Sequence, residues 1–421
     1  MPVPTMSSIR LPAGDRDELR PRWSIGRVRL LVAAVHAAIA APLIIQAVYH
    51  PDRFTGPDDF TTHLRVALPE TWRKPWVPGP PHFVWHTLVK VFSWLLPGTG
   101  YLLGAVVVSV LFAALTGIVW FEVLRRPGFD GARLRRRWAA AGSVVLVCME
   151  SPTTLRGWGA IVGPDYWLPL HAYHGPTGPA ARPLVALLVV GFVTAASGRS
   201  PDRLGRWAAR WMAPLSVAAA LTKPTLSVLL IPTVFIVGLT WSRRDGRRPW
   251  EVVGPLVRRF VAPTIGIVGL QYVVMAFQVP PKYRQETLIR PFEVILAYHL
   301  YRPLFWTVLA LPVAMLATFG WRLLQDRCVE VSLWAFAGGL GLLVLQSSTN
   351  LDRDGLVALW FLVHPTALFL LFGTRRGLEI LRTEPGTVAR AGLVACALLA
   401  ALSCFAWAEF TSCELQQACF T

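Results

Sequence analysis

The most constraining feature of the sequence is the alternation of long apolar runs with short arginine clusters, which fall at every second interruption. Hydrophobic residues make up 54% of the chain and charged residues only 15%. A helix needs about 20 mostly apolar residues to cross a bilayer, and several runs approach that length. No long polar stretch remains for a soluble domain, so the pattern predicts a polytopic membrane protein.

We predict an all-α fold, a transmembrane bundle of about eleven spans, with an interfacial helix in the first outside loop. The expected spans are 27–48, 100–124, 138–150, 182–197, 207–222, 225–241, 260–278, 303–321, 330–346, 355–373 and 391–409. Several are short for a bilayer, so some are expected to tilt, break or merge.

The distribution of basic residues predicts the orientation. Most of the 41 Lys and Arg residues fall on one side of the bundle, and basic residues resist crossing the membrane. This predicts a multi-pass cell-membrane protein with a basic cytoplasmic segment at 1–26, a bundle at 27–409 and an outside C-terminal tail at 410–421. A cleaved signal peptide is the alternative for the first run. That run continues past its small residues through Pro42 to Ile45, which favours an uncleaved span.

The net charge of +17 does not indicate nucleic acid, because the basic residues are dispersed over connectors and no binding module frames them. Membrane lipids with anionic headgroups are the expected partners. The signatures GxxxxGK[ST] and GxGxxG are absent from the sequence, which argues against ATP-driven transport by this chain alone.

The six cysteines form no CxxC pair, so the sequence gives no support for a zinc or thioredoxin-type site, and no metal ligands are assigned. Cys148, Cys396 and Cys404 are expected to be small packing residues. Cys413 and Cys419 lie in the expected outside tail, where a disulfide and two free thiols fit equally well.

The first outside loop, 49–98, carries an acidic pair, Asp58 and Asp59, together with His63 and His82 as candidate substrate-binding residues. A carboxylate in a partly dry site can accept a proton from a hydroxyl, or it can hold a divalent cation as a cofactor. The alternative is that the pair caps a helix beginning near Phe60. Residues 82–96 of the same loop predict a surface helix, with Trp85 and Trp94 at headgroup level.

A first span, a large outside loop with an early acidic pair and a following surface helix together resemble the GT-C superfamily of membrane glycosyltransferases. The resemblance covers the N-terminal third of the chain. It implies a polyprenyl-phosphate-linked sugar as donor, and it implies that Asp58 or Asp59 is the base or metal-linked acid at the acceptor.

The second outside segment, 150–181, mixes aromatic residues with Asp165, His171 and His174. Such a mixture is typical of a sugar pocket, where aromatic faces pack on sugar rings and polar groups bind hydroxyls. Anchoring of Trp and Tyr at the membrane interface is the alternative.

Basic residues on the outside face run against the expected charge bias. Lys223 lies where two expected spans meet, in a turn that resembles turns of bacterial membrane proteins of surface-polysaccharide pathways. Arg284 and Arg302 lie in segment 279–302. We expect these three to bind the phosphate of a lipid-linked donor. For Lys223 the alternative is a side chain that extends to water, and for the arginines it is lipid headgroup contact.

The connector 346–354 contributes Asp352 and Arg353, which either complete the site or pair with each other. In the following span Pro365 is expected to kink the helix, and His364 needs a polar partner or water.

Two functions follow. The first is a GT-C-like transferase that moves a sugar from a polyprenyl phosphate to an outside acceptor. The second is a transporter or flippase of lipid-linked glycans or another anionic substrate. The one-sided polar loops and the lack of a visible inverted repeat in the sequence favour the enzyme.

Overall fold

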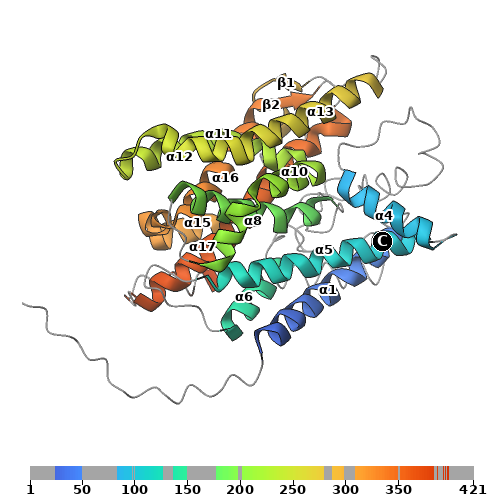
Figure 1. Ribbon diagram of the computed structural model, residues 1–421, viewed down its shortest axis with the longest axis horizontal. Helices are drawn as coiled ribbons and strands as arrows, with labels where there is room; N and C mark the ends of the chain where they lie inside the picture. Colours follow the sequence, from blue (N-terminus) through green and yellow to red (C-terminus); the bar gives the residue numbers. More distant parts are fainter. Residues whose placement is uncertain are drawn as a thin grey trace, which may run out of the picture.

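The computed structural model describes residues 24–49, 83–96, 98, 100–126, 136–148, 177–197, 202–278, 287–297, 309–348, 351–383, 386, 392, 394 and 396–397. Within them the fold is a helical bundle with one short pair of strands (Figure 1). The helices are α1 (Ile25–Tyr49), α4 (Phe83–Leu95), α5 (Gly100–Leu124), α6 (Arg136–Cys148), α8 (Thr177–Ser197), α9 (Arg203–Arg210), α10 (Met212–Thr222), α11 (Pro224–Arg244), α12 (Pro249–Leu256), α13 (Ala262–Gln278), α14 (Glu293–Ala297), α15 (Ala310–Phe319), α16 (Arg327–Leu345) and α17 (Leu351–Thr383).

Six helical stretches in the described part of the chain are long and apolar enough to cross a membrane. They are Ile25–Pro42, Gly100–Leu124, Ala180–Ser197, Pro224–Arg244, Pro249–Val274 and Arg327–Leu345. All six overlap predicted spans, so the chain has the helices expected of a membrane protein. The predicted span 391–409 lies almost entirely outside the described residues.

The predicted span 207–222 has different bounds in the structure, because helix α9 ends at Arg210 and helix α10 begins at Met212. Hydrogen bonds continue across the junction, from Trp211 N to Trp207 O at 3.0 Å and from Leu215 N to Trp211 O at 2.9 Å. Pro214 has no N–H to donate to the Arg210 carbonyl, which explains the irregularity at this point.

The predicted span 260–278 begins earlier than expected. Helix α12 leads into a π-helical turn, Val257–Val261, and then into α13. Pro255 lies at the end of α12 and removes one backbone donor from the ladder. The hydrogen bonding widens to π spacing directly after it.

The surface helix expected at 82–96 is present as α4, but Trp85 does not lie at its exposed face. Trp85 is completely buried, and its Nε1 donates to Ser109 Oγ of α5 at 2.9 Å. Gly104 of α5 makes this packing close, since an added Cβ there would lie 2.6 Å from the Cβ of Phe92. Trp94 is exposed, as expected of a headgroup-level residue.

Helices α1 and α5 pack side by side along the edge of the bundle (Figure 1). The ring of His36 on α1 lies over Gly117 on α5, where an added Cβ would approach His36 Cγ to 2.5 Å. Near the start of α1, Arg29 Nε pairs with Glu122 Oε1 at 2.8 Å. These contacts fix the position of α1 along the length of α5.

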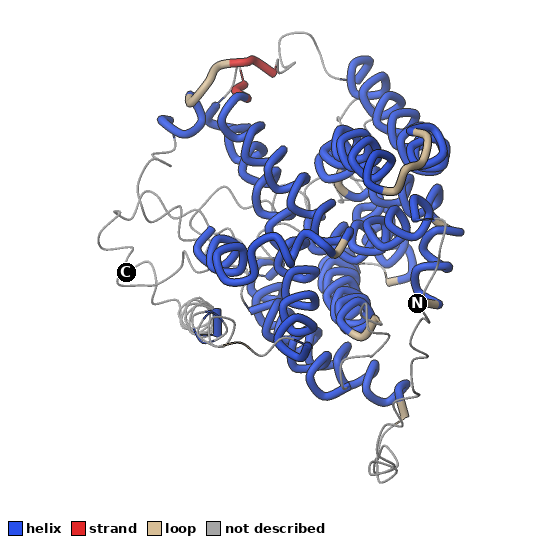
Figure 2. The backbone as a smooth tube through the Cα atoms, turned by 90° about the vertical axis from the view of Figure 1, so that its left-hand side faces the viewer, coloured by secondary structure: helices blue, strands red, loops and turns tan. Residues whose placement is uncertain are grey.

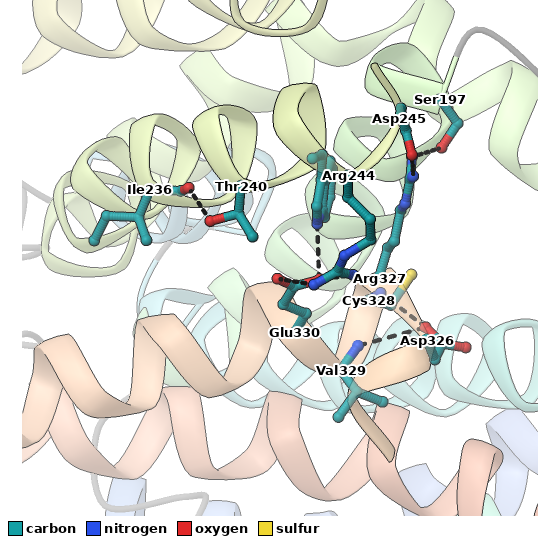
Figure 3. A network of polar contacts seen from close by, with 11 residues as sticks. Ser197, Ile236, Thr240, Arg244, Asp245, Asp326, Arg327, Cys328, Val329 and Glu330 are labelled. Atoms are coloured by element: carbon teal, nitrogen blue, oxygen red, sulfur yellow. Dashed lines mark hydrogen bonds and ion pairs between the residues drawn. The ribbon is translucent and has the colours of Figure 1, made fainter. Parts of the chain in front are cut away.

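Ion pairs join the helices at one end of the bundle. They are Arg126–Asp202, Arg244–Glu330, Arg327–Asp245 and Arg375–Asp326, of which Figure 3 shows Arg244–Glu330 and Arg327–Asp245. Glu330 also accepts a hydrogen bond from Trp241 Nε1 at 2.8 Å, and Asp326 caps α16 through the N–H of Cys328 at 2.7 Å. The network therefore connects α5, α9, α11, α16 and α17 at the end where arginines concentrate.

At the opposite end of α16, strand β1 (Thr287–Ile289) pairs with β2 (Gln346–Ser348) in an antiparallel two-stranded sheet. Figure 2 shows this pair at the edge of the helical body. Thr287 lies opposite Ser348 and Ile289 opposite Gln346. Two segments that the sequence analysis treats as separate outside connectors therefore meet here.

Candidate functional site

Most of the predicted site residues lie outside the described part of the chain. These are Asp58, Asp59, His63, His82, Asp165, His171, His174, Arg284 and Arg302. Asp352 and Arg353 have described backbones in the first turn of α17, but their side chains lie outside the description. Lys223 is the one predicted site residue with a described side chain. The roles assigned to the others remain predictions.

The β1–β2 pair brings two of the predicted segments together. Because the strands are antiparallel and Thr287 lies opposite Ser348, the chain toward Arg284 and the chain toward Asp352 leave the sheet at the same end. The backbone reinforces this junction, since Arg290 N donates to Leu345 O at 3.1 Å. Residues 287–289 and 346–348 are therefore neighbours at this end of the bundle.

Lys223 lies deeper in the bundle, between α10 and α11. It is the single residue separating the two helices, with extended backbone angles of φ −153° and ψ 92°. Pro224 follows at the start of α11, and a proline disfavours helical geometry in the residue before it. The expected helix break is therefore confirmed. The Lys223 side chain is only 6% exposed, which argues against its extending to water.

His364 on α17 is within electrostatic range of two other basic residues, Lys223 and Arg182, the latter from α8. Arg182 is 4% exposed and His364 is 1% exposed, so all three side chains are inside the protein. We call Arg182, Lys223 and His364 the basic cluster.

The sequence analysis did not assign Arg182 or His364 to the site. Arg182 follows a Pro- and Gly-rich stretch and is the first residue of the expected span 182–197. The sequence gives no signal for Arg182, because α8 is apolar all round and residues 185–192 are all buried, so no single face is distinguished.

The basic cluster lies further into the helical body than the end of the bundle that carries the β1–β2 pair. His364 is twelve residues beyond Asp352 in α17, which corresponds to about 18 Å along the helix axis. Gln271 of α13 donates to the Ala220 carbonyl near Lys223 at 3.4 Å, and α13 continues for about 10 Å beyond Gln271. The cluster is thus recessed within the helical body.

The first turn of α11 adds further polar groups beside Lys223. Within the described part of the chain, Thr225 Oγ1 and Ser227 Oγ are buried and make no hydrogen bond. The first backbone N–H groups of a helix also lack partners inside that helix, and the helix dipole favours an anion at this end. The N-terminus of α11 and the basic cluster together form a region suited to a phosphate or carboxylate group.

No group of three or more His, Cys, Asp or Glu side chains among the described residues is arranged to hold a metal ion. The acidic pair proposed for a divalent cation, Asp58 and Asp59, lies outside those residues. The three residues that define the basic cluster can bind an anion and stabilise its charge.

These features define the class of protein as a helical, membrane-type bundle with a recessed group of basic side chains. The sequence matches no protein-family model, and no curated protein is significantly similar to it.

Proposed function

We propose that the chain is a multi-pass membrane glycosyltransferase that moves a sugar from a polyprenyl-phosphate donor to an acceptor outside the cell membrane. The observation that carries the proposal is the burial of Lys223 with Arg182 and His364 beside the N-terminus of α11. Ionisable side chains inside a membrane bundle commonly mark a substrate or ion pathway. A lipid-linked phosphate carries the charge that basic side chains bind, and it can reach a bundle interior from the side of the bilayer.

In the proposed reaction the acceptor hydroxyl attacks the anomeric carbon of the donor sugar. Asp58 or Asp59 takes the hydroxyl proton, the new glycosidic C–O bond forms, and the bond from the sugar to the phosphate oxygen breaks. The leaving group is the polyprenyl phosphate, which gains negative charge. Lys223 and Arg182 stabilise that charge, together with the first-turn N–H groups of α11.

The remaining predicted residues have supporting roles in this proposal. Arg284, Arg302, Asp352 and Arg353 belong to segments flanking the β1–β2 junction and its neighbouring helices, and they contact the donor head group or the acceptor. His63, His82, Asp165, His171 and His174 bind sugar hydroxyls from the two long loops. A divalent cation at the acidic pair is the one cofactor that these assignments admit.

The proposal includes about eleven spans, a cytoplasmic N-terminus and an outside C-terminus. Cysteine labelling in intact cells tests this orientation. In a background with Cys413→Ser and Cys419→Ser, we expect Thr55→Cys to react with a membrane-impermeant maleimide and Arg243→Cys to react only after lysis. The reverse pattern would place the proposed catalytic loop in the cytoplasm and exclude the scheme.

A transporter or flippase is the second candidate, and the recessed position of the basic cluster favours it. Transporters commonly hold their substrates near the bilayer midplane, between helices. The discriminating experiment uses purified protein in liposomes containing a polyprenyl-phosphate sugar and a soluble acceptor on one side only. New glycosidic product supports the transferase, whereas movement of unaltered donor between leaflets supports the transporter.

A further inference from the structure

Helix α9 and the junction that follows it carry a stripe of arginine and tryptophan on their exposed face. The stripe consists of Arg203, Arg206, Trp207, Arg210 and Trp211, and all five residues are exposed. Their spacing of i, i+3, i+4, i+7 and i+8 places them on one side of a helix. We call these five residues the Arg/Trp stripe.

The opposite face of α9 is held tightly against α8. Gly205, Ala208 and Ala209 are buried there. An added Cβ at Gly205 would lie 2.5 Å from Thr194 Oγ1, and one at Gly191 of α8 would lie 3.0 Å from the Ala208 carbonyl oxygen. With backbones this close the helix cannot rotate, so the Arg/Trp stripe points outward permanently.

The start of α9 is fixed as well. Asp202 caps the helix by accepting a hydrogen bond from Gly205 N at 2.7 Å, and its second oxygen pairs with Arg126 Nε of α5 at 2.9 Å. One buried carboxylate thus anchors α9 to a neighbouring span. The Arg/Trp stripe is consequently presented from a rigid support.

The charges of the stripe are not neutralised by the described residues. The side chains of Arg203, Arg206 and Arg210 make no ion pair or hydrogen bond with any residue that the structure describes. Other arginines at this end of the bundle, among them Arg126 and Arg375, are paired with buried acids. The side chains of Arg126 and Arg375 are largely buried, whereas those of the stripe are exposed.

We propose that the Arg/Trp stripe is a binding site for anionic phospholipids, with the guanidinium groups donating hydrogen bonds to headgroup phosphates. Arg206 and Arg210 face outward on a stretch that continues into the short apolar helix α10, and in this proposal that stretch lies at the membrane surface. An arginine in that position needs an anion, and the headgroup layer supplies phosphate at that depth. Trp207 and Trp211 are suited to the boundary between headgroups and acyl chains.

Two other exposed tryptophans each lie beside an arginine. Arg137 lies over the ring of Trp138 at 5.7 Å, and Arg248 lies over that of Trp250 at 5.4 Å. Both tryptophans are exposed, at 58% and 64%. Like the stripe, each pair places a cation beside an aromatic ring at the start of a helix. This inference is independent of the glycosyltransferase proposal and depends only on the bundle lying in a membrane.

The test measures lipids that remain bound to the full-length protein after reconstitution in nanodiscs and detergent extraction, by mass spectrometry. The nanodiscs contain equal amounts of phosphatidylglycerol and phosphatidylcholine. We expect wild type to retain phosphatidylglycerol preferentially and the triple variant Arg203→Gln/Arg206→Gln/Arg210→Gln to lose about tenfold in that preference, as expected for several lost phosphate contacts. The triple Arg→Lys variant keeps the charge and is expected to keep most of it.

Arg243→Gln is the matched control, because Arg243 is exposed at the end of α11 and lies outside the stripe. It is expected to match wild type. Equal retention of both lipids by wild type, or an unchanged preference in the triple Gln variant, would overturn the proposal. Loss of bound phosphatidylglycerol in 10-fold excess inorganic phosphate would overturn it too, since the site would then recognise a free anion. If the triple variant does not fold, the single variants Arg206→Gln and Arg210→Gln replace it, with at least a twofold loss each expected.

Discussion

Asp202 and Arg126 form a buried ion pair in which Arg126 Nε lies 2.9 Å from Asp202 Oδ2, with both side chains less than 10% exposed. The same aspartate caps α9. One side chain therefore sets the start of a helix and attaches that helix to α5. Removing one partner of such a pair leaves an uncompensated charge inside the protein.

We predict that Asp202→Ala lowers the free energy of unfolding by about 3–5 kcal/mol, because it leaves Arg126 unpaired and removes the cap. Asp202→Asn retains an oxygen for the cap, so its loss should be smaller by about 1 kcal/mol. Thermal unfolding in detergent measures both. Glu251→Gln breaks the half-exposed pair with Arg247 and serves as the control, with an expected loss below about 1 kcal/mol. Equal losses for Asp202→Ala and the control would contradict the anchoring role.

The contact of His36 with Gly117 gives a second prediction. Gly117→Ala places a Cβ against the His36 ring and should destabilise the protein by about 1–3 kcal/mol through overpacking. In the double variant Gly117→Ala/His36→Ala the clash is absent, so a double-mutant cycle should show a strong positive coupling. Gly266→Ala in α13 is the control, because an added Cβ there meets nothing within 4 Å. Additive effects of the two changes would mean that the helices do not pack through this pair.

Lys223 provides the third prediction, which concerns the proposed donor site. Lys223→Ala should raise the apparent KM for the polyprenyl-phosphate sugar by at least about tenfold, since a charged contact to phosphate is lost. Arg182→Gln should act in the same direction. Arg243→Ala, which removes an exposed charge elsewhere, should leave the donor KM unchanged. An unaltered KM in Lys223→Ala would mean that the lysine has no part in donor binding.

The acidic pair gives the fourth prediction. We expect Asp58→Asn or Asp59→Asn to abolish sugar transfer while expression and donor binding persist, because an amide cannot accept the acceptor proton. The readout is glycosidic product formed by purified protein, alongside donor binding measured separately. Transfer that persists in the double variant Asp58→Asn/Asp59→Asn would show that neither residue is the base.

The helical class and the positions of six apolar stretches were predictable, because hydropathy and length determine them locally. The break at Lys223 was also predictable, because Pro224 disfavours helical backbone angles in the residue before it. Two irregularities were not predictable: the division of 207–222 at Trp211 and the π-helical turn after Pro255. Both depend on which backbone carbonyls lose a donor and on how the neighbouring helical hydrogen bonds rearrange. Sequence periodicity does not reveal that readjustment.

The site was harder to predict than the fold, for a physical reason. Arg182 and His364 lie 182 positions apart in the chain, and packing of α8 against α17 brings them within electrostatic range of each other. Tertiary packing also determines the position of Trp85, whose indole was expected at headgroup level but donates a hydrogen bond to Ser109 of α5. Side chains with both a polar and an apolar part can satisfy either environment, so the neighbouring helix decides where they lie.

The central claim is that the basic cluster holds the phosphate of a lipid-linked substrate. Binding of a polyprenyl phosphate and of the matching uncharged polyprenol to purified protein tests it most directly, with wild type compared with Lys223→Ala at equal thermal stability. We predict that wild type binds the phosphate at least about tenfold more tightly than the alcohol and that Lys223→Ala removes most of this difference. Equal affinity of wild type for the two lipids, or an undiminished phosphate preference in Lys223→Ala, would contradict the account.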